Sequence, residues 1–277
     1  MSLNLASTIK LSDGRAIPQL GLGVYLSKGK EGEVAMQHAF KHGYRHLDGA
    51  QWYRNEAEMG RAFRASGLKR EDVWITTKVW DANHGYEKTL RSVDESLAVA
   101  KLDYYDLFLL HSPNPGRELR LEAWRGLIDA QKAGKVKSIG VSNYGVHHIR
   151  ELLEKYPNNL PVVNQIEYSP FFQRNEIVEE CLKHDIKIQS YSPLGKGAFV
   201  DLPELKQIAD VHHKTPSQLL IRYVLQKGHI VLPKSVTPSR IEENADVYDF
   251  ELSGQEIAKL DALETGSGVT WDPTKAP

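Results

Sequence analysis

The chain alternates regularly between short apolar segments and longer amphipathic segments. Each apolar segment has the length of a β-strand, and the segment after it carries apolar residues at helical spacing. Strict alternation without a break in composition is typical of a parallel sheet whose strands are joined by helices. Counting from Leu20 gives about eight such units, and eight units that close on themselves make a TIM barrel. We therefore predict one (β/α)8 barrel domain over residues 1–277.

The boundaries of the expected elements follow from apolar periodicity and from glycine and proline stops. The expected strands are Leu20–Tyr25, Arg45–Asp48, Val73–Lys78, Tyr105–Leu110, Ser138–Ser142, Val162–Ile166, Lys187–Ser190 and His229–Leu232. The expected helices are Glu31–His42, Glu56–Ala65, Tyr86–Ala100, Leu119–Ala133, Val146–Lys155, Asn175–His184, Leu205–His212, Ser217–Gln226 and Pro238–Asp246.

Two segments lie outside these units. Thr8–Pro18 contains two short apolar stretches around an Asp13-Gly14 turn, which predicts a β-hairpin that caps one end of the barrel. The polar tail after Leu263 predicts a short loop over one end. An open doubly wound sheet is the alternative fold, but Gly21-Leu-Gly23 lacks the third glycine of its dinucleotide fingerprint.

The charge balance limits the function classes. Lys and Arg number 35 and Asp and Glu 36, so the net charge is −1 and contacts with nucleic acid or anionic membrane are not expected. No apolar run reaches the roughly 18 residues of a membrane helix. Residues 1–8 lack the pattern of a secretory signal. The single cysteine, Cys181, fits a reducing compartment, so we expect a cytoplasmic protein. We also expect it to be a monomer or weak dimer.

Four polar residues stand at or just after the ends of three successive predicted strands. Asp48 ends one strand and Tyr53 follows it, while Lys78 ends the next strand and His111 follows the third. The carboxyl ends of barrel strands meet at one rim, where barrels carry their chemistry. A lysine in an apolar strand requires a partner, and Asp48 is the natural one. A purely structural ion pair is the alternative interpretation.

Together these residues suit the protonation of a carbonyl oxygen. A phenol is a weak acid with a pKa near 10, and we expect Lys78 to lower the pKa of Tyr53. His111 beside the phenol would orient the carbonyl. No nucleophilic side chain accompanies the set, so the attacking group would be a hydride from a nicotinamide cofactor.

The later strand ends carry groups suited to such a cofactor. Ser142-Asn143, Asn164-Gln165 and Ser190-Tyr191-Ser192 offer hydroxyls and amides, and Leu194-Gly-Lys-Gly197 is a flexible loop with a lysine. The segment Leu232–Arg240 ends the eighth strand and opens a helix with two cations, which favours a phosphate.

These residues fall into ordered motifs through which the chain resembles the aldo-keto reductase family over essentially its whole length. The motifs are His46-Leu-Asp-Gly-Ala-Gln-Trp-Tyr-Arg-Asn-Glu56, Leu109-Leu-His-Ser-Pro113, Gly134-Lys-Val-Lys-Ser-Ile-Gly-Val-Ser-Asn143, Asn164-Gln-Ile-Glu-Tyr-Ser-Pro170, Ser190-Tyr-Ser-Pro-Leu-Gly195, Leu232-Pro-Lys-Ser235 and Arg240-Ile-Glu-Glu-Asn244. Within the family, the chain most resembles short microbial members that reduce diketo-sugar acids, α-keto esters and α-keto amides.

The resemblance implies a barrel that reduces aldehydes or ketones with NADPH. It implies Tyr53 as general acid, Lys78 and Asp48 as the residues that tune it, and His111 as the residue that orients the carbonyl. The implied cofactor contacts are Ser142, Asn143 and Gln165 on the carboxamide, Tyr191 on the ring, Ser192, Leu194 and Lys196 along the pyrophosphate, Lys234, Ser235 and Arg240 at the 2′-phosphate, and Glu243 and Asn244 at the adenine.

The chain departs from common family residues at Gly49, Arg54, Ser112 and Tyr25. None of these is a catalytic position, so activity is expected and the substrate is left open. The expected substrate pocket consists of Tyr25, Trp52, Trp80, Ser112 and Asn114.

No metal site is expected. His42 and His46 have a spacing of four residues, but Gly43 interrupts a helix between them and no third ligand is evident.

Two other functions are consistent with the fold. Lys78 could form a Schiff base in a barrel aldolase, but Tyr53 and the phosphate corner argue against this. A regulatory subunit that binds NADPH with negligible turnover is the second alternative, and no added amphipathic segment or charged extension indicates a partner surface.

Overall fold

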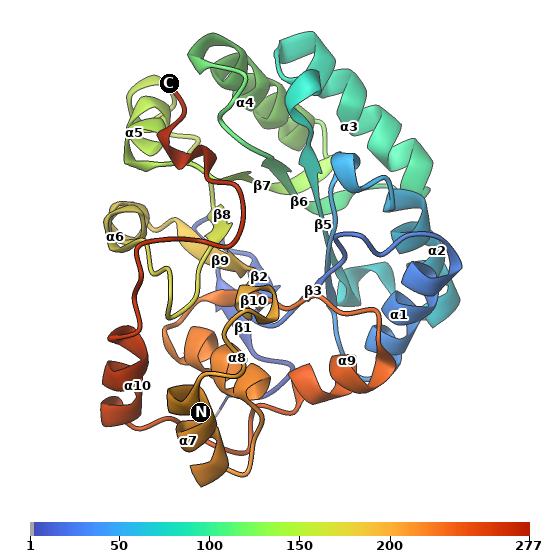
Figure 1. Cartoon of the computed structure of the whole chain (residues 1–277). Helices are drawn as coiled ribbons and strands as arrows, with labels where there is room; N and C mark the ends of the chain where they lie inside the picture. Colours follow the sequence, from blue (N-terminus) through green and yellow to red (C-terminus); the bar gives the residue numbers. More distant parts are fainter. Residues whose placement is uncertain (1–2) are drawn as a thin grey trace.

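Eight parallel strands form the central sheet of this computed structural model, which describes residues 3–277 (Figure 1). Each strand pairs with its neighbour in the chain. Parallel bridges from Leu20 to Val231 and from Gly23 to Lys234 bring the two edges of the sheet together. The predicted (β/α)8 barrel is thereby confirmed. The strands are β3 (Leu22–Gly23), β4 (His46–Asp48), β5 (Trp74–Val79), β6 (Tyr105–Leu110), β7 (Val136–Ser142), β8 (Val163–Glu167), β9 (Lys187–Tyr191) and β10 (Ile230–Leu232).

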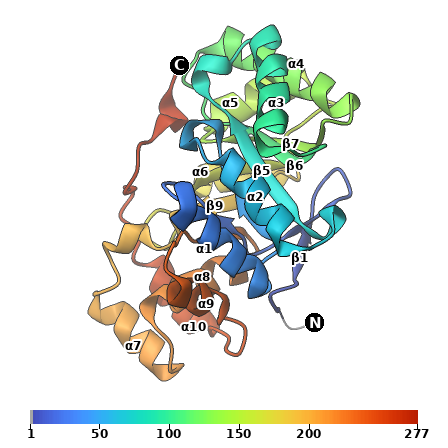
Figure 2. The same cartoon turned by 90° about the vertical axis from the view of Figure 1, so that its right-hand side faces the viewer.

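The helices surround the sheet on its outer side (Figures 1 and 2). They are α1 (Gly29–Lys41), α2 (Glu56–Ser66), α3 (Tyr86–Ala100), α4 (Arg117–Lys132), α5 (Val146–Lys155), α6 (Asn175–Lys183), α7 (Pro203–Val211), α8 (Pro216–Gln226), α9 (Pro238–Ala245) and α10 (Gly254–Asp261). The predicted helices begin and end within two residues of these bounds. No helix in residues 3–277 has both the length and the apolar character needed to cross a membrane.

The N-terminal hairpin closes the amino end of the barrel, as predicted. Its strands β1 (Thr8–Lys10) and β2 (Ala16–Pro18) pair antiparallel. Leu11 and Ile17 from the hairpin are buried in one apolar cluster with residues of the barrel strands and with Val162, which precedes β8. The other buried members of that cluster are Trp74, Leu107, Leu109, Val162, Val163 and Ile230. Full burial of a large aliphatic side chain contributes about 1.5–3 kcal/mol to the stability of the fold. Because these side chains pack together here, the amino end of the barrel is filled and does not open to solvent.

Helix α10 is absent from the sequence prediction. The Ser253 side chain accepts a hydrogen bond from the backbone N–H of Glu256, and the Glu256 side chain reaches back to Ser253. This capping box has a sequence pattern, a serine followed three residues later by a glutamate, that marks a helix start. The pattern is therefore the signal that could have revealed α10.

The C-terminal segment runs from α10 past α6 and across the end of β8 to α5, as shown in red in Figure 1. Glu167, the last residue of β8, accepts hydrogen bonds from the backbone of Val269 and from Thr270. At the far end, His147 and His148 of α5 contact the carbonyl of Ala276. The predicted loop over one barrel end therefore lies at the carboxyl ends of the strands.

Candidate active site

A buried ion pair joins the ends of β4 and β5. The Lys78 side chain is fully buried, and its Nζ donates to Asp48 Oδ1 at 2.5 Å and to the carbonyl of Gly49 at 2.8 Å. Burial raises the pKa of Asp48 and lowers the pKa of Lys78, while the attraction between the two charges opposes both shifts. An unpaired ammonium at this depth would cost several kcal/mol. The pair predicted from the two strand ends is thus present.

Glutamine side chains extend this pair to two further strands. Gln165 Nε2 donates to Asp48 Oδ2 at 2.7 Å and to Gln189 Oε1 at 2.8 Å. Gln165 lies on β8 and Gln189 on β9. In the sheet, β5, β6 and β7 separate these two strands from β4. Both carboxylate oxygens of Asp48 are therefore engaged, which fixes the side chain across the barrel interior.

Tyr53 stands beside the ion pair on a short 3-10 helix, Gln51–Tyr53, that follows β4. The Nζ of Lys78 lies 5.1 Å from the centre of the Tyr53 ring, and the His111 ring centre lies 5.6 Å from it with the planes nearly perpendicular. The four residues predicted from three strand ends therefore meet at one place.

The expected lowering of the Tyr53 pKa is wrong for this structure. The pKa of Tyr53 is raised well above its usual value, first by burial and then by the negative charge of Asp48. Lys78 directs its protons at Asp48 and Gly49, and no hydrogen bond in the described residues links it to the phenol. Tyr53 is consequently a protonated phenol at neutral pH.

His111 is buried and neutral. Its side chain packs against Trp80, with ring centres 5.5 Å apart, and only 5% of the residue is exposed. Burial lowers the pKa of His111 well below its ordinary value, and the charge of Lys78 adds to the effect. Its Nδ1 has no hydrogen-bond partner among residues 3–277. A buried ring nitrogen without a partner is available to a bound molecule.

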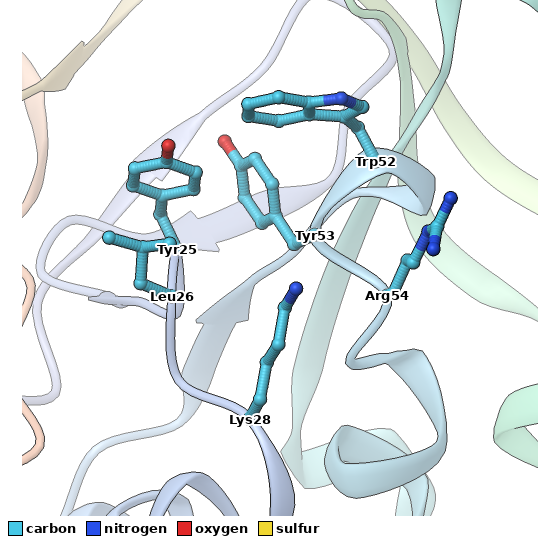
Figure 3. Close-up of a pocket in the computed structure, with 6 residues that line it drawn as sticks. All are labelled: Tyr25, Leu26, Lys28, Trp52, Tyr53 and Arg54. Atoms are coloured by element: carbon cyan, nitrogen blue, oxygen red, sulfur yellow. The ribbon is translucent and has the colours of Figure 1, made fainter.

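A cavity of about 290 Å³ opens above Tyr53. Figure 3 shows Tyr25 beside Tyr53 with the Trp52 ring next to them. The two cations Lys28 and Arg54 complete the polar part of its lining. The lining residues are Tyr25, Leu26, Lys28, Trp52, Tyr53 and Arg54.

The other predicted pocket residues do not line this cavity. Trp80 stacks behind Trp52, with ring centres 5.3 Å apart. Ser112 is buried, and its Oγ donates to the carboxylate of Asp81 at 2.8 Å. Asn114 is exposed and its backbone N–H contacts Ser112. A substrate role for these three residues stays a prediction.

The groups expected to bind a carboxamide lie next to His111. Asn143 donates from Nδ2 to the His111 carbonyl at 3.0 Å and accepts from the Tyr191 hydroxyl at 2.8 Å. Ser142 donates to the Gln165 carbonyl at 2.9 Å. These hydroxyl and amide groups offer both donors and acceptors, which is what a primary amide requires.

The loop after β9 carries the residues predicted to bind a pyrophosphate. Ser192 and Lys196 have positive φ angles of 50° and 53°, and Lys196 Nζ donates to the carbonyl of Val269 at 3.1 Å. Leu194 is partly buried against the main core. Of the predicted pyrophosphate residues, Lys196 thus contacts the C-terminal segment.

A corner suited to phosphate lies where β10 leads into α9. Lys234 and Arg240 are exposed, and neither belongs to a salt bridge in the described part of the chain. Arg240 lies in the first turn of α9, whose free N–H groups also favour an anion. Ser235 Oγ accepts from the N–H of Thr237 at 3.0 Å and shapes the turn.

Glu243 and Asn244 lie at the far end of this corner, on α9. Glu243 accepts from the Thr215 hydroxyl at 2.6 Å, and Asn244 is buried. The residues from Ser142 to Asn244 include hydroxyl, amide and cationic groups, and their role in binding a cofactor stays a prediction.

A family model described as the aldo/keto reductase family matches residues 20–265. The chain belongs to this family. The match covers all eight barrel strands and every residue of the candidate site.

Named relatives match this aldo/keto reductase over nearly its full length. It is 42% identical over 270 residues to the methylglyoxal reductase DkgA of Escherichia coli strain K12, covering 96% of this chain and 97% of that protein. It is 41% identical over 274 residues to the glyoxal reductase of Bacillus subtilis strain 168, covering 99% and 98%. The solved structure of a Bombyx mori aldo-keto reductase in complex with NADP has a TM-score of 0.92 at 32% identity, with 99% of each chain covered.

Two residues that position the site, Gln51 and Asn55, lie within the His46–Glu56 motif, but the sequence alone assigns them no role. Gln51 accepts from the N–H of Trp80 at 2.8 Å and donates to Ser96 at 3.0 Å, so it fixes the turn that carries Tyr53. Asn55 is buried and donates to the carbonyls of Val24 and Ser27, which holds the Tyr25 loop. All four contacts join segments that are distant in sequence, and no local pattern signals them.

Replacing Lys78 by Met should lower the free energy of unfolding by about 3–5 kcal/mol, because Asp48 would be left buried without its partner. Urea denaturation followed by circular dichroism measures the loss. Lys206→Met is the matched control, since Lys206 pairs with Asp201 at the surface and solvent screens that pair. Equal midpoints for the two variants would contradict the assigned cost of the buried charge.

Proposed function

We propose that this aldo/keto reductase reduces a small aldehyde or ketone, with Tyr53 as general acid and NADPH as the hydride donor. The observation that carries the proposal is the position of Tyr53. Its phenol lies on the cavity wall and is protonated, and it stands next to both the Asp48–Lys78 pair and the neutral His111.

Tyr53 would deliver its proton to the carbonyl oxygen. Proton transfer from a positioned side chain contributes about 10²–10⁴-fold to a rate. The phenolate that remains would carry a negative charge close to Lys78, whose Nζ is 5.1 Å from the ring centre. Attraction to a nearby ammonium in a low-dielectric site is strong, so Lys78 would offset part of the cost that burial and Asp48 impose on the phenolate.

His111 would hold the carbonyl for this step. A neutral imidazole offers one donor and one acceptor, whereas a charged imidazolium would compete with Tyr53 as the acid. The depressed pKa of His111 keeps the ring neutral. Edge contacts with the Trp80 and Tyr53 rings fix the position of His111, so a carbonyl oxygen bound to it would be oriented.

The cofactor would lie across the carboxyl ends of β7 to β10, and when bound it supplies the hydride. Ser142, Asn143 and Gln165 would hold the carboxamide, and Tyr191 would support the ring. Ser192, Leu194 and Lys196 would line the pyrophosphate, and Glu243 and Asn244 the adenine. Lys234, Ser235 and Arg240 would bind the 2′-phosphate that distinguishes NADPH from NADH.

The substrate would be an α-dicarbonyl, α-keto ester or keto-sugar. The cavity is small and aromatic, with cations on one side, which suits a compact molecule rich in oxygen. Relatives named methylglyoxal reductase and glyoxal reductase, each more than 40% identical, support the α-dicarbonyl class.

Tyr53→Phe should reduce kcat for methylglyoxal by at least about 100-fold, because it removes the acid and retains the ring. Fluorescence titration should show NADPH affinity within about threefold of the parent, since a 0.6 kcal/mol change corresponds to about that factor. Tyr86→Phe removes a phenol hydroxyl from the outer face of α3, where it contacts Asp129, and should retain activity. A Tyr53→Phe enzyme with undiminished turnover would overturn the role of the phenol.

The rate of reduction should not fall between pH 8 and about 5.5. A histidine with the ordinary pKa of about 6.5 would lose most of its neutral form over this interval. The lowered pKa of His111 keeps the neutral form present throughout, since that form is lost only as pH falls through the folded-state pKa. Tyr53, with its raised pKa, stays protonated over the same range.

The measurement is kcat/KM for methylglyoxal at saturating NADPH and constant ionic strength, corrected for cofactor decay. A tenfold fall toward pH 5.5 that disappears in His111→Asn would show that His111 titrates normally.

The double variant Lys234→Ala/Arg240→Ala should weaken NADPH binding at least about tenfold and leave NADH binding nearly unchanged. Hydrogen bonds to charged groups contribute about 1.5–3 kcal/mol, and 1.4 kcal/mol is tenfold. Calorimetric dissociation constants for both cofactors test this. Lys155→Ala/Lys259→Ala carries the same charge change at exposed sites, and a comparable loss there would contradict specific phosphate recognition.

A further inference from the structure

A cluster of two histidines and one glutamate lies on the outside of the barrel between α1 and α9, and we refer to it as the α1–α9 cluster. His38 and His42 lie one turn apart on the last part of α1 and at its C-cap. Glu242 comes from α9, which lies against α1 in both views (Figures 1 and 2). None of the three residues has a role in the proposed reaction.

Both imidazoles converge on the same carboxylate oxygen. His38 Nε2 lies 2.8 Å and His42 Nε2 3.1 Å from Glu242 Oε1. The two rings lie side by side, with centres 4.1 Å apart. All three ligand atoms fall within 4.8 Å of one another. Two nitrogen donors and one oxygen donor are thus directed at one small volume.

A backbone contact determines which nitrogen of His42 faces this volume. His42 Nδ1 lies 3.0 Å from the carbonyl of His38, so Nδ1 carries the proton and donates it. Nε2 is thereby left to face Glu242. Either a second ring proton or a bound cation can lie between this nitrogen and the carboxylate oxygen. Metal-binding histidines are commonly oriented in this way, by donating the other ring N–H to a backbone carbonyl.

We propose that the α1–α9 cluster binds a divalent transition-metal ion of the Zn²⁺ type. Zn²⁺ accepts imidazole nitrogen and carboxylate oxygen at about 2.0–2.2 Å in a tetrahedron, which places ligand atoms roughly 3.4 Å apart. The observed separations of 2.8 and 3.1 Å require the side chains to open by about 0.3–0.6 Å to reach that geometry. The side chains are 21%, 34% and 49% exposed, so they can move and an ion can reach them.

The bound ion would complete its shell with water, since the three protein ligands leave one tetrahedral position. A hard cation such as Mg²⁺ prefers oxygen ligands, so two imidazoles select against it. The ion would join the helix after β3 to the helix after β10. It would therefore cross-link the first and last units of the barrel at the seam where the sheet closes.

The test is a Zn²⁺ titration of the full-length, tag-free protein against a chromophoric chelator, with Co²⁺ absorption as a second readout of the ligand set. We expect one equivalent to bind per chain at micromolar concentration and to raise Tm. Loss of even a supporting partner of a metal ligand costs about 10–100-fold in affinity, so Glu242→Gln and His42→Asn should each weaken binding at least tenfold. Both positions are at the surface, and unchanged circular dichroism would verify the fold.

The matched control is His212→Gln, which removes a single His–Glu pair on another face, with Glu256 at 2.9 Å. It should leave Zn²⁺ stoichiometry and affinity unchanged. Equal affinity in Glu242→Gln and the parent would place the ion elsewhere and overturn the proposal. Absence of stoichiometric binding in the parent would also overturn it and leave the cluster as an ion pair alone.

Discussion

The burial of the Lys78 charge is the constraint on which the rest of the site depends. An ammonium removed from water is tolerated only when nearby groups offset its lost hydration. The carboxylate of Asp48 and the carbonyl of Gly49 do this in the barrel interior. Both contact the ammonium directly, and Gln165 holds the second oxygen of Asp48. The result is a rigid polar layer that links β4, β5 and β8. Tyr53 and His111 rest against that layer.

Parallel pairing makes this convergence possible. Because all eight strands point the same way, residues that are distant in the chain share one rim. Asp48 and Gln165 are 117 residues apart and hydrogen-bond directly. The turns after the strands then aim the side chains, and each turn is tied down by contacts such as those of Gln51 and Asn55. The barrel brings the site residues to one rim, and the amide side chains of Gln51 and Asn55 fix the turns that orient them.

Much of this arrangement could be predicted from the sequence. The spacing of apolar residues and the lengths of the apolar segments identified the eight strands and nine of the ten helices found in residues 3–277. The ends of the predicted strands identified Asp48, Tyr53, Lys78 and His111 as residues that lie together. Properties that depend on burial could not be predicted in the same way. The direction of the Tyr53 pKa shift follows from how deeply the ring lies and from which partner takes the protons of Lys78. The contact of Ser112 with Asp81 depends in the same way on tertiary packing.

The hairpin that fills the amino end has a consequence for how small molecules reach the site. Leu11 and Ile17 are buried in the cluster that closes that end, so the carboxyl rim is left as the way to Tyr53 in the described structure. The two reactants of the proposed reaction would both enter and leave through this rim. Two aliphatic side chains at one end of the molecule thus confine exchange with solvent to the other end.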